Sequence, residues 1–461
     1  MTTRGATSEL AGFVSDLRYG DIPDDVKAKA REVVLHAWGV QLATSTLPWS
    51  KLVYRTIRAE GGAPVSTVVN YGHRTSPAHA TFVNASFGHA FEMDDNHGSS
   101  AVKMGCVNVS AGLAVGEQLL SSGAELIVAV VAGYEVVLRA GLAFRAFRES
   151  HEPHPTGTLG GLAGATVAAK LIGLDETATT HALGFGVSNR AGYHEAPSTG
   201  RGHVKRVFPG MSGAAGVRAA YLAEAGLTGT GRTLDAGMGF CKAFEVDDAG
   251  VGALTAGLGD KWHIMDVHYK VFAQDGYIQP MTEAIENLRA RKEFDVDDID
   301  HVTVGTHARA VNHVIGLIRD PKDLTDAQFS GNFSVALALV TGGAGVREYT
   351  EENLNDPRIR ALSKRVFLEI DDEIEAEFHR TRPRGAKVRI HLKDGTELYE
   401  YVPNLRALTP GDLDAKFRSL AALALDDDAI EQLETAVHGL DEVRDVSSLG
   451  RLLVGGTRVA S

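Results

Sequence analysis

A dense group of charged side chains lies between two apolar, small-residue segments of this 461-residue chain, at residues 82–90 and 107–116. Between them stand Glu92, Asp94, Asp95, His97 and Lys103. A buried charge is costly unless it is paired, so a fold that packs the two segments together must pair these groups with one another. The group is therefore a candidate functional site. A solvated acidic loop between two helices is the alternative.

Length and composition limit the class of protein. A chain of 461 residues exceeds what one hydrophobic core usually supports, which predicts two domains. The hydrophobic share of 44% and the charged share of 23% are ordinary for a globular protein. The net charge of −13 and the absence of a long basic run exclude nucleic acid as a partner. A small anionic substrate is still compatible, because it responds to the local field of its pocket.

Cysteine content and apolar runs predict the compartment. Cys106 and Cys241 are the two cysteines, which gives neither a disulfide framework nor a metal knuckle. No stretch reaches 18 consecutive apolar residues, and the first ten residues lack the apolar core of a signal peptide. We therefore expect a cytoplasmic enzyme or binding protein that makes no contact with a membrane.

The periodicity of apolar residues predicts a mainly α fold. Helices are expected over residues 25–44, 107–120, 124–147, 157–172, 210–225 and 410–437. Strand character appears at 299–307, and Asp394-Gly395 between alternating segments predicts a hairpin over 386–402. These elements suggest a large all-helical domain (1–267), an inserted smaller α+β lid domain (268–403) and a C-terminal return to the helical domain (404–461).

Three further segments carry side chains suited to chemistry. His151–Thr156 precedes a Gly-rich helix, and a histidine at a helix entrance can titrate near neutral pH beside a bound anion. Arg201–Arg206 forms a cationic loop that contains His203 and Lys205. His268–Lys270 falls at the proposed domain boundary, where ligand sites are common. Structural or solvated roles are the alternative for each segment.

Together these groups are suited to removing a proton from a carbon beside a carboxylate. Lysine and arginine would stabilise the resulting enediolate, and a nearby base would accept the proton. Asp94, Asp95 and His97 could in principle hold a metal, but their spacing matches no zinc motif. No metal and no organic cofactor is therefore expected.

Several segments in order along the chain resemble the MmgE/PrpD family, which includes 2-methylcitrate dehydratase, cis-aconitate decarboxylase and iminodisuccinate epimerase. The matching segments are residues 33–40, 80–84, 89–95 and 132–136, His154-Pro155-Thr156 with Gly160, Lys205 before Gly210, Lys270, and 327–330. The resemblance implies a helical domain with an α+β lid, a homodimer, an active site between the domains and no cofactor.

The resemblance also implies roles for individual residues. The acidic motif of the family falls on Glu92, Asp94 and Asp95, its His-Pro-Thr histidine on His154, and its pocket lysines on Lys205 and Lys270. The candidate site residues are as follows: His154, Lys103, Asp94 and Glu92 as catalytic groups, and His97, Asn96, Lys205, Lys270, Tyr269 and His203 as substrate-binding groups.

The chain departs from the family pattern at several of these positions. Lys103 stands where family members usually carry a histidine, Glu92 where they usually carry an aspartate, and residues 271–275 hold no serine, cysteine or histidine. A lysine acts as a base only if its surroundings lower its pKa, whereas a fixed cation that binds a carboxylate requires no such shift. The sequence therefore slightly favours the carboxylate-binding role for Lys103.

The leading hypothesis is a cofactor-independent lyase that acts on a small carboxylate and ends in elimination or decarboxylation. An isomerase, such as an epimerase that returns the proton to the same carbon, is the second hypothesis. A catalytically inactive relative that binds a metabolite or another chain is the third. The sequence does not identify the substrate.

Overall fold

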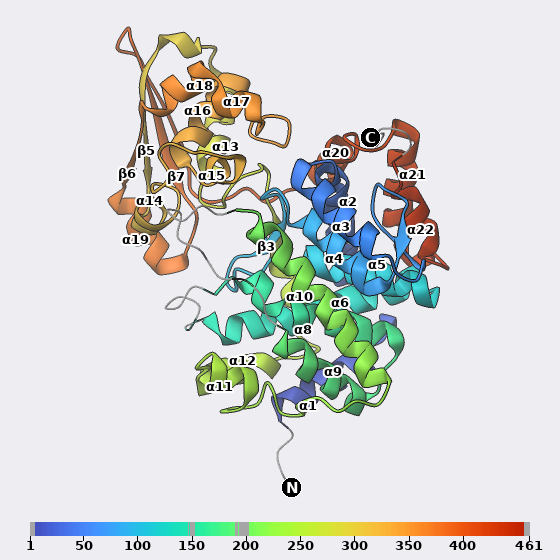
Figure 1. The fold of residues 1–461 in the computed structure, drawn as a ribbon. Helices are drawn as coiled ribbons and strands as arrows, with labels where there is room; N and C mark the ends of the chain where they lie inside the picture. Colours follow the sequence, from blue (N-terminus) through green and yellow to red (C-terminus); the bar gives the residue numbers. More distant parts are fainter. Residues whose placement is uncertain (1–4, 146, 148–152, 190–191, 193–201, 456–461) are drawn as a thin grey trace.

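The computed structural model describes residues 5–145, 147, 153–189, 192 and 202–455, and most of these residues are helical (Figure 1). His151 and Arg201, singled out in the sequence, lie outside the described residues. The first part of the chain contains α1 (Ala6–Asp16), η1 (Tyr19–Asp21), α2 (Asp24–Ser45), α3 (Pro48–Glu60), β1 (Ser66–Thr67), β2 (Arg74–Thr75), α4 (Pro77–Gly88), β3 (Asp95–His97), α5 (Gly105–Leu119), α6 (Gly123–Ala143), α8 (Pro155–Ile172), α9 (Glu176–Ser188), α10 (Val204–Glu224), α11 (Gly239–Ala243), α12 (Asp248–Thr255), η3 (His263–Asp266) and β4 (Val267–Tyr269).

A smaller α+β part follows. It contains α13 (Gln279–Arg291), η4 (Val296–Asp298), β5 (Ile299–Thr306), α14 (Ala308–His313), α15 (Leu324–Gln328), α16 (Gly331–Thr341), α17 (Glu351–Asn355), α18 (Pro357–Ser363), β6 (Val366–Ile370), α19 (Asp372–Thr381), β7 (Ala386–Leu392) and β8 (Glu397–Val402). The chain then forms α20 (Pro410–Ala421), α21 (Asp427–His438), η5 (Leu440–Glu442) and α22 (Ser447–Leu452). The predicted mainly α fold with a smaller α+β part is confirmed.

Helix α6 is the central helix of the first part. Ser122 and Glu125 form a capping box at its start, which satisfies backbone N–H groups that would otherwise lack partners. The helix is long and apolar enough to cross a membrane, yet 94% of its apolar window is buried inside the protein. Its burial in the core explains its apolar composition.

Helices α8 and α10 pack closely because both are rich in small residues. A Cβ added at Gly164 of α8 would lie 2.2 Å from the carbonyl oxygen of Gly213 in α10, so the contact requires glycine. Helix α10 begins at Val204, six positions earlier than predicted, and carries Pro209 inside its second turn. The predicted cationic loop is therefore partly wrong, because Lys205 and Arg206 already belong to the first turn of this helix.

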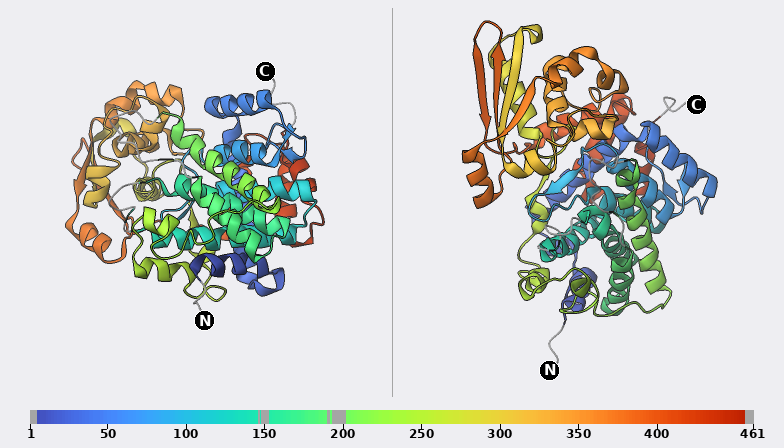
Figure 2. Two further views of the ribbon diagram at one scale, coloured as in Figure 1. Left: turned by 60° about the horizontal axis from the view of Figure 1, so that its bottom comes forward. Right: turned by 60° about the vertical axis from the view of Figure 1, so that its left-hand side comes forward.

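Four strands form the sheet of the α+β part, in the order β6-β5-β7-β8. The predicted hairpin is confirmed: β7 and β8 pair antiparallel, and Gly395 in their turn has φ 87°. Strand β6, which the sequence did not predict, pairs parallel with β5. Helices α13 and α16 contact the sheet (Figures 1 and 2).

Two large hydrophobic cores are present, one in the helical part and one in the α+β part. Residues 90–97 of the helical part form a segment that we call the acidic loop. Its residues Phe91 and Met93 are buried in the core of the α+β part. Helix α20 packs against α2 after the chain leaves the sheet, and α21 is a separate helix where the sequence predicted one continuous helix. The acidic loop is thus held at the junction of the two cores.

Candidate active site

Five charged side chains meet in what we call the acid–lysine cluster: Glu92, Asp94, Lys103, Lys205 and Lys270. The Lys205 ammonium donates to Glu92 Oε1, and Lys270 Nζ donates to Glu92 Oε2 at 2.7 Å. Lys270 Nζ also lies 3.6 Å from Asp94 Oδ1. Glu92, Asp94 and Lys270 are all buried. Two ammonium groups are thus paired with two carboxylates, and Lys103 lies close enough to feel the charges of both carboxylates.

The backbone at Glu92 directs its side chain into the acid–lysine cluster. Glu92 has φ 54°, a left-handed conformation that is strained for a residue with a side chain. Its neighbours Phe91 and Met93 are anchored in the second core, so the chain turns Glu92 away from them. Burial raises the pKa of Glu92, but the charges of Lys205 and Lys270 outweigh burial and hold it well below its ordinary value. Glu92 is thus a fixed anion.

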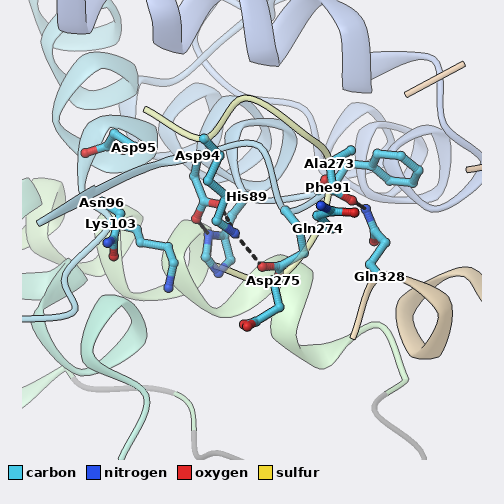
Figure 3. A network of polar contacts seen from close by, with 12 residues as sticks. His89, Phe91, Asp94, Asp95, Asn96, Lys103, Ala273, Gln274, Asp275 and Gln328 are labelled. Carbon is cyan, nitrogen blue, oxygen red and sulfur yellow. Dashed lines mark hydrogen bonds and ion pairs between the residues drawn. The ribbon is translucent and has the colours of Figure 1, made fainter. Parts of the chain in front are cut away.

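A line of contacts leads from Asp94 to His154. His89 Nδ1 lies 2.8 Å from Asp94 Oδ2 (Figure 3). The rings of His89 and His154 meet edge to face with centroids 5.6 Å apart. Both histidines are buried, and His154 occupies the N-cap position of α8. Burial lowers the pKa of His89, against the attraction of Asp94. A neutral imidazole therefore separates the carboxylate from His154.

Lys103 differs from the other two lysines of the acid–lysine cluster. Burial lowers its pKa below 10.5; Asp94 and Glu92 oppose this shift, while the charges of Lys270 and Lys205 add to it. No described residue accepts a hydrogen bond from its ammonium, whereas Lys205 and Lys270 are both held by Glu92. Lys103 is thus an uncommitted amine whose pKa is lowered towards the range in which an amine acts as a base.

Asp95 belongs to the structure of the loop rather than to the cluster. Its carboxylate accepts hydrogen bonds from Gly105 N at 3.0 Å and from the Tyr134 hydroxyl at 2.7 Å, and it points away from Asp94 in Figure 3. Burial raises the pKa of Asp95 to about 6. A Cβ at Gly105 would lie 2.7 Å from this carboxylate, so glycine permits the contact at the start of α5.

Four residues that the sequence assigned to substrate binding contact residues outside the acid–lysine cluster. Asn96 Nδ2 bonds to His268 at 3.0 Å, and His97 Nδ1 bonds to the Ser100 hydroxyl at 2.7 Å. Tyr269 packs against His36 and Lys29 of α2, and His203 is exposed and stacks on Trp49. Their roles in binding substrate stay predictions.

Braces around the acid–lysine cluster were missed by sequence reasoning. Arg206 donates to the Ala90 carbonyl and to the Thr325 hydroxyl, and its guanidinium lies 3.7 Å from the centre of the Trp49 ring. The Gln328 amide donates to the carbonyls of Phe91 and Ala273 at 2.9 and 2.7 Å (Figure 3). Both side chains tie the acidic loop to the α+β part. Both residues lie in segments that the sequence singled out, 201–206 and 327–330, but their partners are distant in the chain, so this role could not be read locally.

A further brace comes from helix α20, the first helix after the α+β part. Lys416 Nζ donates to the Lys270 carbonyl at 2.5 Å and to His36 Nε2 at 2.8 Å, while His36 also bonds to the backbone of Met93. Burial, followed by the charge of Lys270, lowers the pKa of Lys416 to about 7. The pair thus holds the backbones of both the acidic loop and Lys270.

A metal ion could be held beside the site rather than in it. His97, His263 and Asp266 offer ligand atoms that all lie within 4.8 Å of one another. Asp94 and Asp95 are committed to His89 with Lys270 and to Gly105 with Tyr134 respectively, so the set of Asp94, Asp95 and His97 does not converge. The expectation that no metal is required stays a prediction.

The amino-acid sequence is similar to two domain families and to several known proteins. The profile described as the MmgE/PrpD N-terminal domain matches residues 8–249, and the profile of the MmgE/PrpD C-terminal domain matches 272–442. The chain is 27% identical to a cis-aconitate decarboxylase of Aspergillus terreus, over 97% of this chain and 96% of that protein. It is 26% identical to the cis-aconitate decarboxylase of Mus musculus, over 99% and 94%. A mitochondrial 2-methylcitrate dehydratase of Yarrowia lipolytica is 31% identical over 23% of this chain and 21% of its own length.

Proposed function

Because this chain belongs to the MmgE/PrpD family, we propose that it is a cofactor-independent lyase of a small polycarboxylate. In a dehydration the enzyme removes a proton from a carbon beside a carboxylate and the substrate loses hydroxide; in a decarboxylation the electron pair of the broken C–C bond stays on the substrate, which takes up a proton. Lyase activity as such is supported by relatives named as a decarboxylase and a dehydratase. Homodimer assembly and a cytoplasmic location stay predictions.

One observation carries the proposal: the ammonium groups of Lys205 and Lys270 and the amine of Lys103 lie beside two buried carboxylates and two imidazoles. When the proton leaves, the electron pair moves into the substrate carboxylate as an enediolate, and the fixed ammonium groups of Lys205 and Lys270 stabilise it. Such charges act strongly where water is excluded.

Lys103 and His154 are the acid and base of the proposal. The lowered pKa of Lys103 removes the main argument against a lysine base, so the structure favours this role over carboxylate binding alone. His154, connected to Asp94 through His89, then delivers a proton to the departing hydroxide; in a decarboxylation, which needs no base step, it protonates the carbon that loses carbon dioxide.

The test is turnover of a panel of di- and tricarboxylic acids, with cis-aconitate and 2-methylcitrate included, in D₂O after exhaustive chelation. Mass spectrometry and proton NMR follow the acids. A dehydrated or decarboxylated product is expected. Solvent deuterium in unchanged substrate without such a product would show an isomerase instead. Activity that returns only with an added divalent ion would refute cofactor independence and direct attention to His97, His263 and Asp266.

Substitution of Lys103 with arginine should separate its two roles. Arginine keeps the positive charge but cannot be deprotonated in a protein. We expect kcat to fall about 10²-fold, the lower end of the effect of a general base, while KM stays within a few-fold. In the wild type, kcat should rise with pH as Lys103 loses its proton, at a pKa below 10.5, and the variant should lack this rise.

The pH–rate profile of both proteins is the measurement. Near-full activity of Lys103→Arg with an unchanged profile would show that Lys103 is a cation that binds substrate and not the base.

A further inference from the structure

A cavity of about 790 Å³ lies next to the segments that lead into the acid–lysine cluster. Loop residues 98–101 of the helical part line one side of it. Its other sides come from the lower end of the sheet in Figure 1: α14, the end of α19, the segment leading into β7, and residues 404–407 after β8. Its volume is that of a site for a small organic ligand, about 300–1,000 Å³.

The lining of this cavity is strongly cationic. Six arginines contribute to it, and we call it the arginine cavity: Arg145, Arg309, Arg380, Arg382, Arg384 and Arg406. Among the described residues that line it there is no aspartate or glutamate. The whole chain carries a net charge of −13, so this concentration of positive charge runs against the overall composition.

Nearby carboxylates neutralise some of these arginines, and two of the six form no ion pair with a described residue. Arg380 is paired with Glu377, and Arg406 lies 3.6 Å from Glu286. Arg384 lies over the Tyr277 ring at 5.4 Å, and neither Arg384 nor Arg309 forms an ion pair with a described residue. Guanidinium groups present a planar pair of donors that matches a carboxylate.

The arginine cavity shares a wall with the acid–lysine cluster. His268, which lines the cavity, bonds to Asn96, and the two residues pair across β3 and β4. The loop over residues 98–101 ends two positions before Lys103, and His268 stands two positions before Lys270. The cavity therefore adjoins the two segments of the chain that lead into Lys103 and Lys270.

We propose that the arginine cavity is an anion-binding site that takes the carboxylates of a di- or tricarboxylic substrate on its way to the acid–lysine cluster. This inference rests on the proposed function, because it identifies the substrate of that site as a polycarboxylate. The guanidinium forks of Arg309 and Arg384 bind the carboxylates, and the positive field of the lining raises the local concentration of anions at the entrance. A monocarboxylate gains little from this arrangement because it has one group to offer.

The test uses propane-1,2,3-tricarboxylate as a probe, with binding measured by titration calorimetry at 20 and 300 mM salt. The variant carries Arg309→Gln and Arg384→Gln. Its matched control is Arg389→Gln, an arginine of β7 that stands five positions after Arg384 and does not line the cavity. We expect the double variant to bind the probe at least tenfold more weakly than the wild type at low salt, and the control to bind like the wild type. Salt should weaken wild-type binding more than that of the double variant, because screening acts on the missing charges.

Three results would overturn the inference: no binding of the probe to the wild type, equal binding to the double variant, or tighter binding of inorganic phosphate than of the probe. The titration requires no turnover, so it decides the inference independently of the lyase assay. If turnover of a tricarboxylate is found, the double variant should show a KM about tenfold higher with unchanged kcat. Loss of probe binding in the double variant of a protein that turns over no acid would support the anion site and refute the lyase.

Discussion

Replacement of His154 with alanine should lower kcat by about 10²–10⁴-fold, the usual range for the loss of a general acid or base. His154 is buried at the N-cap of α8 and reaches Asp94 through His89. The N-terminus of a helix also favours a negative charge, so substrate and imidazole are drawn to the same place. His154 combines an imidazole with a connection to Asp94 of the acidic loop through His89. Among the candidate groups, its loss should therefore harm turnover most.

Steady-state kinetics with the substrate found in the lyase assay is the measurement, and KM should change little because the charges that bind the substrate stay in place. His181→Ala serves as the matched control, since that histidine of α9 contacts the Gly229 carbonyl at 3.2 Å. Thermal melting of both variants shows whether the fold is intact. Full activity of His154→Ala together with loss of activity in Lys103→Arg would assign the chemistry to the lysine alone.

The second large effect is expected on stability. Glu92→Gln should lower the free energy of unfolding by about 3–5 kcal/mol, the cost of removing one partner of a buried ion pair. Lys270 would keep its buried charge with a neutral amide in place of the carboxylate. Denaturant unfolding at pH 7 measures the loss. Asp320→Asn, in an exposed pair with Lys322, is the control and should cost at most about 1 kcal/mol.

The pH dependence of this effect has a definite sign. The folded pKa of Glu92 is well below its ordinary value, so its stabilisation is present above the unfolded pKa of about 4.3 and is lost as pH falls through the folded value. The difference between wild type and Glu92→Gln should therefore shrink in acid. The double variant Glu92→Gln/Lys270→Met should be less destabilised than the sum of the single variants. A loss below 1 kcal/mol for Glu92→Gln would show that the pair adds no net stability.

Local patterns predicted much of the fold. The apolar spacing of α2, α5 and α8 and the Asp-Gly turn of the hairpin are properties of short segments, so the sequence alone identifies them. Strand β6 is different, because its five residues are stabilised by pairing with β5 far away in the chain. Residues 204–206 were predicted to lie in a loop before a helix at 210, but they form the first turn of α10, which packs against α8.

The candidate site divides in the same way. Charge and the family resemblance identified Glu92, Asp94, Lys205 and Lys270, which the structure brings together. They could not show that Lys270 is buried rather than a loop cation. His89 closes an apolar helical segment and offered no sign of a contact with Asp94. Such roles depend on which segments pack together, and that information is spread over the whole chain.

The brace from Lys416 has a consequence for synthesis of the protein. The Lys270 carbonyl that it holds is made 146 residues earlier, and a ribosome adding about 5–20 residues per second takes roughly 7–30 s to cover that interval. During that time the core of the helical part still lacks its C-terminal residues, from Leu413 to Leu453, and His36 and Lys270 lack their contact with Lys416. The nascent chain therefore contains the reactive groups of the site before it contains the helix that supports them. We expect the site to be competent only after α20 has been made and has packed against α2.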